Sequence, residues 1–105
     1  MDKSQIIDLL KSFLIILKRH GIHIDDAILY GSYAKGDNQD SSDIDLMIVS
    51  KEFDQFNDEL AGLIWNICNK YDHRIEPFLI GLDKFNTDND SPLIQDVKET
   101  GIAIM

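Results

Sequence analysis

Residues 31–45 read GSYAKGDNQDSSDID, and the rest of the chain can be interpreted outward from this stretch. An apolar run at 27–30 precedes it, and a second apolar run at 46–49 follows it. Short apolar runs bounded by glycine and polar residues are typical of strands. We therefore expect strands at 24–30 and 43–49. The second is nearly continuous in Ile, Leu, Met and Val, which favours a strand covered on both faces.

The segment between these strands is expected to form a short helix from Ser32 to Lys35, ended by Gly36, and then a polar loop over 37–42. On the N-terminal side, Ser4 can cap a helix that runs to about His20. Its apolar positions share one helical face: Ile6, Leu10, Phe13, Leu14 and Leu17.

A second amphipathic helix is predicted over 55–71. Its buried stripe would be Phe56, Leu60, Leu63, Ile64, Ile67 and Tyr71. Trp65 and Cys68 lie beside this stripe, so each is either a core residue or part of a partner surface.

The C-terminal third predicts one more strand and one more helix. Residues 74–80 form the strand, and Pro77 within it indicates an edge position or a bulge, because proline cannot donate to the ladder. Residues 83–90 are polar and are expected to form a loop. A helix then runs from Ser91 to Gly101, and 102–105 adds a strand or a packing segment. The pattern predicts one α/β domain with helices packed against a small mixed sheet.

Composition limits the possible partners. A chain of 105 residues with 44% hydrophobic content suits a single domain over residues 1–105. Its 10 basic and 19 acidic residues give a net charge of −9. Because nucleic acid is bound mainly through clustered Lys and Arg, we expect no direct nucleic-acid binding.

Targeting signals are not evident in the sequence. Cys68 is the single cysteine and cannot form an intramolecular disulfide. The chain contains no signal-peptide pattern and no apolar run of membrane-spanning length. We therefore expect a cytoplasmic protein without membrane association.

The Gly31-Ser32 turn has the chemistry of a phosphate site. Gly31 would let the backbone approach a phosphate closely, and Ser32 would offer its hydroxyl and amide at the start of a helix. Lys35 could contact a phosphate or could simply be solvated. Taken alone, the turn is better explained as an ordinary strand-to-helix connection with a serine cap.

Asp43 and Asp45 are two apart on a predicted strand, so their side chains would leave the same face about 7 Å apart. Paired carboxylates at that spacing can share Mg²⁺ or bracket two ions. An isolated Asp-X-Asp is often only a solvated pair. Combined with the phosphate turn, the pair favours nucleotidyl transfer from a magnesium nucleoside triphosphate. An acidic chain would repel a polyphosphate without such a cation.

The pattern from Gly31 to Asp45 resembles the signature of the DNA-polymerase-β-like nucleotidyltransferase superfamily, and in particular the minimal nucleotidyltransferases of bacteria and archaea. The resemblance implies that Gly31 and Ser32 bind the triphosphate, with Lys35 and Ser42 beside them. It implies that Asp43 and Asp45 hold one or two Mg²⁺ ions and that ATP is the donor.

The same resemblance requires a third carboxylate on a neighbouring strand, close to the attacking hydroxyl. Glu76 is the best candidate, as both metal ligand and catalytic residue. Many relatives have aspartate here without a following proline, so Pro77 leaves Asp72 and Asp83 as alternatives.

Three functions fit the sequence. Relatives of this size resemble the antitoxin half of HEPN–MNT pairs, which favours AMP transfer to a hydroxyl of a HEPN-type helical partner within a homo- or hetero-oligomer. A second possibility is a non-catalytic module that masks such a partner by contact. The third is a nucleotidyltransferase acting on a small molecule of the aminoglycoside kind.

Overall fold

The computed structural model describes residues 1–39, 41–55 and 57–105. In chain order the elements are α1 (Lys3–Arg19), β1 (Asp26–Tyr30), α2 (Ser32–Lys35), β2 (Ile44–Ser50), the 3₁₀ turn η1 (Lys51–Phe53), α3 (Asp58–Tyr71), β3 (Ile75–Gly81), α4 (Leu82–Thr87), α5 (Pro92–Thr100) and β4 (Ile102–Ala103). The expected strands and the helices on either side of them are therefore present, each within a few residues of its predicted bounds.

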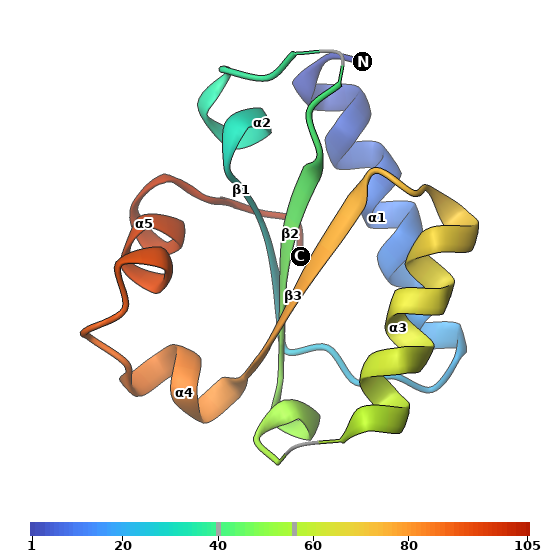
Figure 1. The fold of residues 1–105 in the computed structure, drawn as a ribbon, viewed down its shortest axis with the longest axis vertical. Coiled ribbons are helices and arrows are strands. Elements are labelled where there is room, and N and C mark those ends of the chain that lie inside the picture. Colours follow the sequence, from blue (N-terminus) through green and yellow to red (C-terminus); the bar gives the residue numbers. More distant parts are fainter. Residues whose placement is uncertain (40, 56) are drawn as a thin grey trace.

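The four strands form one mixed sheet in the order β3-β2-β1-β4. β1 runs antiparallel to β2 and to β4, whereas β2 and β3 are parallel. α1 and α3 cover one face of this sheet, and α4 and α5 lie against the other (Figure 1). The prediction of a small mixed sheet with packed helices is confirmed.

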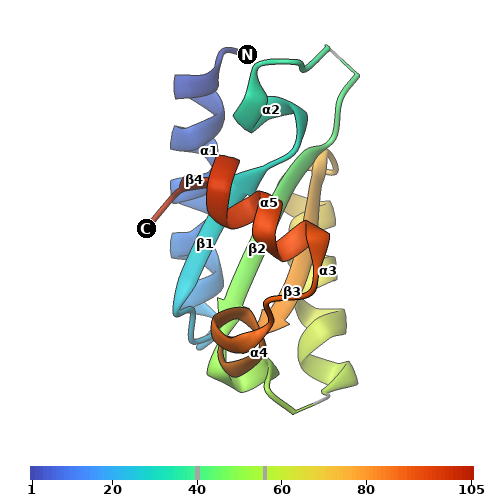
Figure 2. The same ribbon diagram turned by 90° about the vertical axis from the view of Figure 1, so that its left-hand side faces the viewer.

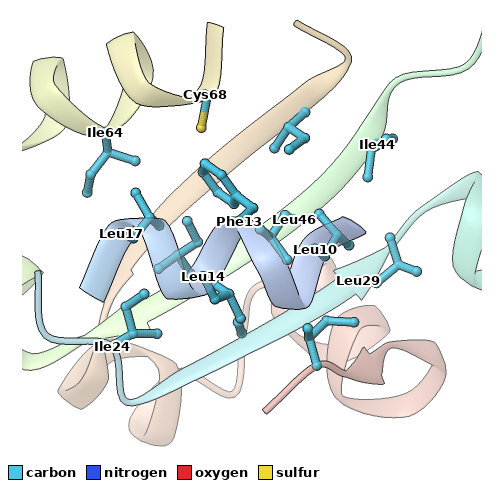
Figure 3. Close-up of a cluster of buried hydrophobic side chains, with 14 of the residues drawn as sticks. Leu10, Phe13, Leu14, Leu17, Ile24, Leu29, Ile44, Leu46, Ile64 and Cys68 are labelled. Carbon is cyan, nitrogen blue, oxygen red and sulfur yellow. The ribbon is translucent and has the colours of Figure 1, made fainter. Parts of the chain in front are cut away.

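The larger core lies between the sheet and the α1/α3 layer. Figure 3 shows Leu10, Phe13, Leu14 and Leu17 of α1 directed toward strand residues such as Leu46. All five residues predicted for the buried face of α1 are buried, because their spacing places them on one stripe. Phe13 also packs against Tyr71 of α3, with ring centroids 5.5 Å apart.

A second apolar cluster fills the space on the α4/α5 side, where Figure 2 shows both helices crossing the strands. Met47 and Val49 of β2 belong to it, whereas Leu46 and Ile48 belong to the first cluster. Residues 46 to 50 of β2 are buried without interruption. The expectation of a strand covered on both faces is confirmed.

Two helix predictions need correction. α1 begins one residue after Asp2, not at Ser4, because Asp2 and Gln5 form a reciprocal capping box with two 2.8 Å hydrogen bonds. In α3, Ile64 and Ile67 are buried as predicted, but Leu63 is 39% exposed. Leu60 and Tyr71 are only half-buried. Phe56, assigned to the same stripe, lies outside the described residues.

The prediction of a loop over 83–90 is wrong for its first half, because Leu82–Thr87 form α4. Phe85 is buried in the second cluster and anchors this short helix to the sheet. The Asp83 amide also donates to Asp54 Oδ1 at 3.1 Å. These are tertiary contacts, which a polar local sequence does not reveal.

Pro77 lies on an edge strand, as predicted, and the β2–β3 register runs through it without a bulge. The amide of Ile44 donates to the carbonyl of Arg74, so the even-numbered residues of β3 bond to β2. Pro77 therefore points its nitrogen away from β2 and costs no ladder bond. Among the described helices, none is both long and apolar enough to cross a membrane.

Candidate nucleotide site

The glycine turn and the second aspartate meet in space. Gly31 ends β1 with a φ of 74°, a conformation that favours glycine. A Cβ atom at position 31 would collide with the Asp45 carboxylate, and Oδ2 of Asp45 would be its nearest neighbour. Gly31 therefore leaves the space that Asp45 occupies, and a ligand held by the turn would lie beside this carboxylate.

Ser32 begins the single helical turn of α2 and is half-buried. Its carbonyl oxygen accepts a 2.9 Å hydrogen bond from the Asp37 amide, which closes the turn. Among the hydrogen bonds between described residues, none uses the Ser32 hydroxyl or the amides of Ser32 and Tyr33 as donors. These donors are suited to phosphate oxygens. With only four residues, α2 adds little dipole, so the local groups would provide the attraction.

Lys35 and Ser42 are engaged within the protein. The Lys35 ammonium pairs with Asp96 Oδ2 of α5 at 3.2 Å. The Ser42 hydroxyl accepts a hydrogen bond from the Gln39 amide at 2.8 Å. Residue 40 of the intervening loop lies outside the description. The expected contacts of Lys35 and Ser42 with a nucleotide remain predictions.

The carboxylates of β2 and β3 are brought side by side by strand register. Asp45 is the direct partner of Tyr30 on β1 and of Glu76 on β3. Directly paired residues point to the same face and lie about 5 Å apart. Tyr30, Asp45 and Glu76 thus form a row across three strands, on the face that α4 and α5 cover farther along the sheet (Figure 2).

Two members of this row, Tyr30 and Asp45, have perturbed pKa values. Burial, followed by the charges of Glu76 and Asp43, raises the pKa of Asp45. Burial, followed by Asp45 and Glu76, raises the pKa of Tyr30 to about 12. Negative charge is therefore concentrated around Asp45, and a bound cation would relieve it.

Asp43 precedes β2 by one residue and is exposed. It lines a hollow of about 210 Å³ together with Glu76, Trp65 and Arg74, among other residues. Asp43 and Glu76 therefore border one hollow, and the charge of Asp43 also acts on Asp45.

Among the described residues, none of the three carboxylates forms an ion pair. Arg74, which lines the same hollow as Asp43 and Glu76, donates instead to both carboxylate oxygens of Asp72, at 2.7 and 3.0 Å. The described residues also contain no preformed cluster of three or more metal-ligating side chains. The site thus offers carboxylates that would need further ligands, and Mg²⁺ commonly takes one or two carboxylates and completes its shell with water and phosphate oxygens.

Two alternatives for the third carboxylate are less suitable. The carboxylate of Asp72 is occupied by Arg74, and this hydrogen bond is the main reason that the pKa of Asp72 is lowered. Asp83 follows the far end of β3 and lies in α4. Glu76 alone among the three candidates is in register with Asp45.

Tyr30 is a site residue that the sequence interpretation missed, because it was counted only within an apolar strand. Its position directly before Gly31 was the available signal. Tyr30 is the last residue of its strand, and the antiparallel partner strand starts at the aspartates. Pairing of the two strands therefore places Tyr30 beside one of these aspartates.

Comparisons with known proteins agree with this geometry. A family model described as "Polymerase beta, Nucleotidyltransferase" matches residues 11–105. The Methanocaldococcus jannaschii protein named "Putative protein adenylyltransferase MJ0141" is 33% identical over 81 residues, covering 71% of this chain and 79% of that protein.

The fold is also similar to the crystal structure of a protein from Sulfolobus solfataricus described as a putative nucleotidyltransferase. The TM-score is 0.64 with 14% identity, and the match covers 96% of this chain and 80% of the other. At that identity the likeness concerns the fold. The family match over almost the whole chain, together with the relative of 33% identity, shows that this protein belongs to the polymerase beta nucleotidyltransferase family.

Proposed function

We propose that this protein is a Mg²⁺-dependent adenylyltransferase that transfers AMP from ATP to a hydroxyl group of a partner protein. The observation that supports it best is the contact between the Gly31 turn and Asp45, with Glu76 in register on the next strand. A phosphate-sized ligand at the turn would lie next to two adjacent carboxylates. Few other reactions need that combination.

In this proposal Asp43, Asp45 and Glu76 hold the metal, which would neutralise the phosphates and orient the α-phosphorus. The chemistry of the donors fits, because carboxylate oxygens are the preferred protein ligands of Mg²⁺. The Ser32 hydroxyl and the amides of the turn would bind the β- and γ-phosphates. Lys35 and Ser42 could join them while keeping their present partners, because the Lys35 ammonium uses one of its three donors on Asp96 and the Ser42 hydroxyl only accepts from Gln39.

The reaction would be an in-line displacement. The acceptor oxygen forms a bond to the α-phosphorus while the bond from that phosphorus to the bridging oxygen breaks. Pyrophosphate leaves with the electron pair of the broken bond. Glu76 lies on β3, two strands away from β1 and the phosphate turn, which is the side from which the acceptor would approach. In this proposal Glu76 takes the proton of the acceptor hydroxyl and passes it to water.

A protein acceptor is supported by two observations. The relative from M. jannaschii is named as a protein adenylyltransferase. The chain itself is strongly acidic, which suits a basic partner. By analogy with HEPN–MNT pairs, we propose a HEPN-type helical protein as acceptor and an antitoxin role for this chain.

The test is transfer of label from α-³²P-ATP to a HEPN-type partner, with and without Mg²⁺. Asp43→Asn, Asp45→Asn and Glu76→Gln should each lower the rate by roughly a hundredfold or more, since each removes a charge that acts in the transition state. Asp83→Asn is the matched control, because Asp83 is exposed and outside the row. The masking module would be favoured by two results together: the Asp43/Asp45 double variant still neutralises the partner, and the wild type transfers no label to it.

A further inference from the structure

We propose that the acceptor polypeptide binds as an extended, basic segment along the free edge of β3, with an apolar side chain seated between Trp65 and Phe78. This inference rests on the proposed function, because it identifies where that reaction's second substrate binds.

The strand order decides the side from which an acceptor can enter. The phosphate turn follows β1, Asp45 is on the central strand β2, and Glu76 is on the edge strand β3. In an in-line displacement the attacking and leaving oxygens lie on opposite sides of the phosphorus. If the leaving pyrophosphate lies toward the Gly31 turn, the acceptor oxygen must approach from the β3 side.

A groove lies along this side of the molecule, and we call it the edge groove. It has a volume of about 320 Å³ and runs between the β3 edge, the start of α3 and η1. The residues that matter here are Phe53, Ala61, Trp65, Pro77, Phe78 and Leu79. Trp65 also lines the hollow that contains Asp43 and Glu76. The edge groove therefore adjoins the hollow that contains Asp43 and Glu76, and the Trp65 indole borders both.

The edge groove exposes unusually large apolar side chains. Trp65 is 42% exposed and Phe78 is 41% exposed. Phe78 is two residues from Glu76 on β3 and on the same face of the strand. Aromatic residues that remain exposed next to a catalytic row are typical of binding hot spots.

The backbone of β3 favours an extended occupant. Because the even-numbered residues bond to β2, the odd-numbered residues direct their polar groups to the free edge. Leu79 can there offer an N–H and a carbonyl to an added strand, whereas Pro77 offers only its carbonyl. Strand addition of this kind gives affinity through the main chain, while pockets for alternate side chains give selectivity.

Charge specifies the occupant further. Asp43 and Glu76 line the hollow that adjoins the edge groove at Trp65, and Asp58 and Glu59 follow Asn57 of the groove in the first turn of α3. The whole chain carries a net charge of −9. A segment with lysine or arginine on both sides of an apolar residue matches this pattern, whereas an acidic segment does not.

The test uses three synthetic peptides with the full-length protein. The first alternates lysine and leucine around a central tyrosine, the second has serine in place of leucine, and the third has glutamate in place of lysine. Each carries a terminal dye so that binding is followed by fluorescence anisotropy. Trp65 is the sole tryptophan, so its emission independently reports occupation of the edge groove.

We expect the lysine–leucine peptide to bind at least about tenfold more tightly than the other two and to shift the Trp65 emission. Phe78→Gln and Trp65→Gln should each weaken its binding by a similar factor. Phe78→Gln should leave the KM for ATP unchanged, because Phe78 belongs neither to the phosphate turn nor to the hollow that contains Asp43 and Glu76. Leu63→Gln is the matched control, since Leu63 is a 39% exposed apolar residue on the same helix outside this groove. Circular dichroism of each variant verifies that the fold is kept.

Equal binding of the three peptides, or unchanged binding in both Phe78→Gln and Trp65→Gln, would overturn the inference. A second copy of the protein is the competing occupant of the edge groove. If the protein alone formed a dimer that Phe78→Gln abolished, and the Trp65 emission changed when that dimer was diluted, the inference would also be overturned. The proposed enzymatic function has a separate readout. Peptide binding without transfer of label to any acceptor would leave the docking surface standing and refute the activity.

Discussion

Gly31 combines two constraints at one residue. Its φ of 74° is costly for any residue with a side chain, and a Cβ atom there would meet the Asp45 carboxylate. The first constraint concerns the backbone alone, whereas the second concerns the functional site. The two can be separated, because Gly36 has a φ of 80° with no neighbour within 4 Å of the Cβ position.

Gly31→Ala should therefore lose both stability and activity, whereas Gly36→Ala should lose stability alone. We expect Gly36→Ala to lower the free energy of unfolding by about 1–2 kcal/mol, because Gly36 is left-handed with a ψ of 12°. Gly31→Ala should cost about 3 kcal/mol, because a φ of 74° with a ψ of −150° is a conformation almost confined to glycine. Gly31→Ala should in addition lower adenylyl transfer by roughly a hundredfold, because the methyl group displaces Asp45. Urea denaturation and label transfer measure the two effects. Equal activity of the two variants would contradict the contact between Gly31 and Asp45.

Asp45 is a candidate site residue whose charged form is disfavoured in the folded protein. Its pKa is raised above the usual value of 3.8, first by burial and then by Glu76 and Asp43. Between 3.8 and the raised pKa, the folded protein binds more protons than the unfolded chain. The free energy of unfolding should therefore fall as pH rises through that window.

Asp45→Asn should remove this destabilisation. In the absence of Mg²⁺ at neutral pH, we expect its Tm to exceed that of the wild type by roughly a few degrees. The difference should disappear below pH 3.8, where Asp45 is protonated in both states. Differential scanning calorimetry across the pH range measures it, with Asp83→Asn as control. A lower Tm for Asp45→Asn at neutral pH would show that the carboxylate stabilises the free protein.

At the scale of elements, the connection from α3 to β3 places the third carboxylate. Asp72 ends α3, and its carboxylate accepts hydrogen bonds from the backbone amide and the guanidinium of Arg74. β3 then begins at Ile75, which sets Glu76 opposite Asp45. The Asp72–Arg74 pair also engages a guanidinium that lines the same hollow as Asp43 and Glu76.

Asp72→Asn should reveal this pair as a pH-dependent contribution to stability. The Arg74 hydrogen bond is the largest cause of the lowered pKa of Asp72, so the contribution is fully present above 3.8 and is lost as pH falls through the folded pKa. With the Asp72 side chain only 15% exposed, we expect a loss of about 1 kcal/mol at neutral pH that shrinks in acid.

The control is Asp96→Asn, which breaks the exposed pair with Lys35. It should change the free energy of unfolding by less than about 0.5 kcal/mol, because exposed ion pairs contribute little. Urea denaturation at several pH values compares the two variants. An Asp72→Asn effect that did not change with pH would exclude the ion pair as its cause.

For the whole molecule, the net charge of −9 opposes binding of a free triphosphate. ATP should therefore bind at least about tenfold more weakly in EDTA than with Mg²⁺. Without Mg²⁺, raising the ionic strength to about 0.2 M should strengthen binding, because salt screens the repulsion. Isothermal titration calorimetry measures both effects. Tight ATP binding in EDTA that weakened with salt would instead indicate a basic site elsewhere on the surface.

Much of the architecture was accessible from local sequence patterns. The period of the apolar residues located α1, and the unbroken apolar run located the doubly covered β2. Pro77 indicated an edge strand, and the Ser91-Pro92 pair indicated the start of α5. Each of these features depends on interactions within a few residues or on the chemistry of one residue.

Features that depend on distant contacts were predicted incorrectly or missed. α4 forms because Phe85 finds a place in the second apolar cluster, although its own sequence is polar. Leu63 was placed in the buried stripe of α3, yet it is exposed because α1 and the sheet cover only part of that helix. Tyr30 joins the carboxylate row only through its pairing with Asp45.

Local patterns were enough to select the candidate site residues: a glycine-serine turn, two aspartates with one residue between them and an acidic residue on a later strand. The three-dimensional arrangement was needed to show that Glu76, and neither Asp72 nor Asp83, pairs with Asp45. The physical reason is strand register. A parallel pairing between segments thirty residues apart sets Asp45 opposite Glu76, and the packing of α3 against the sheet holds that pairing in place.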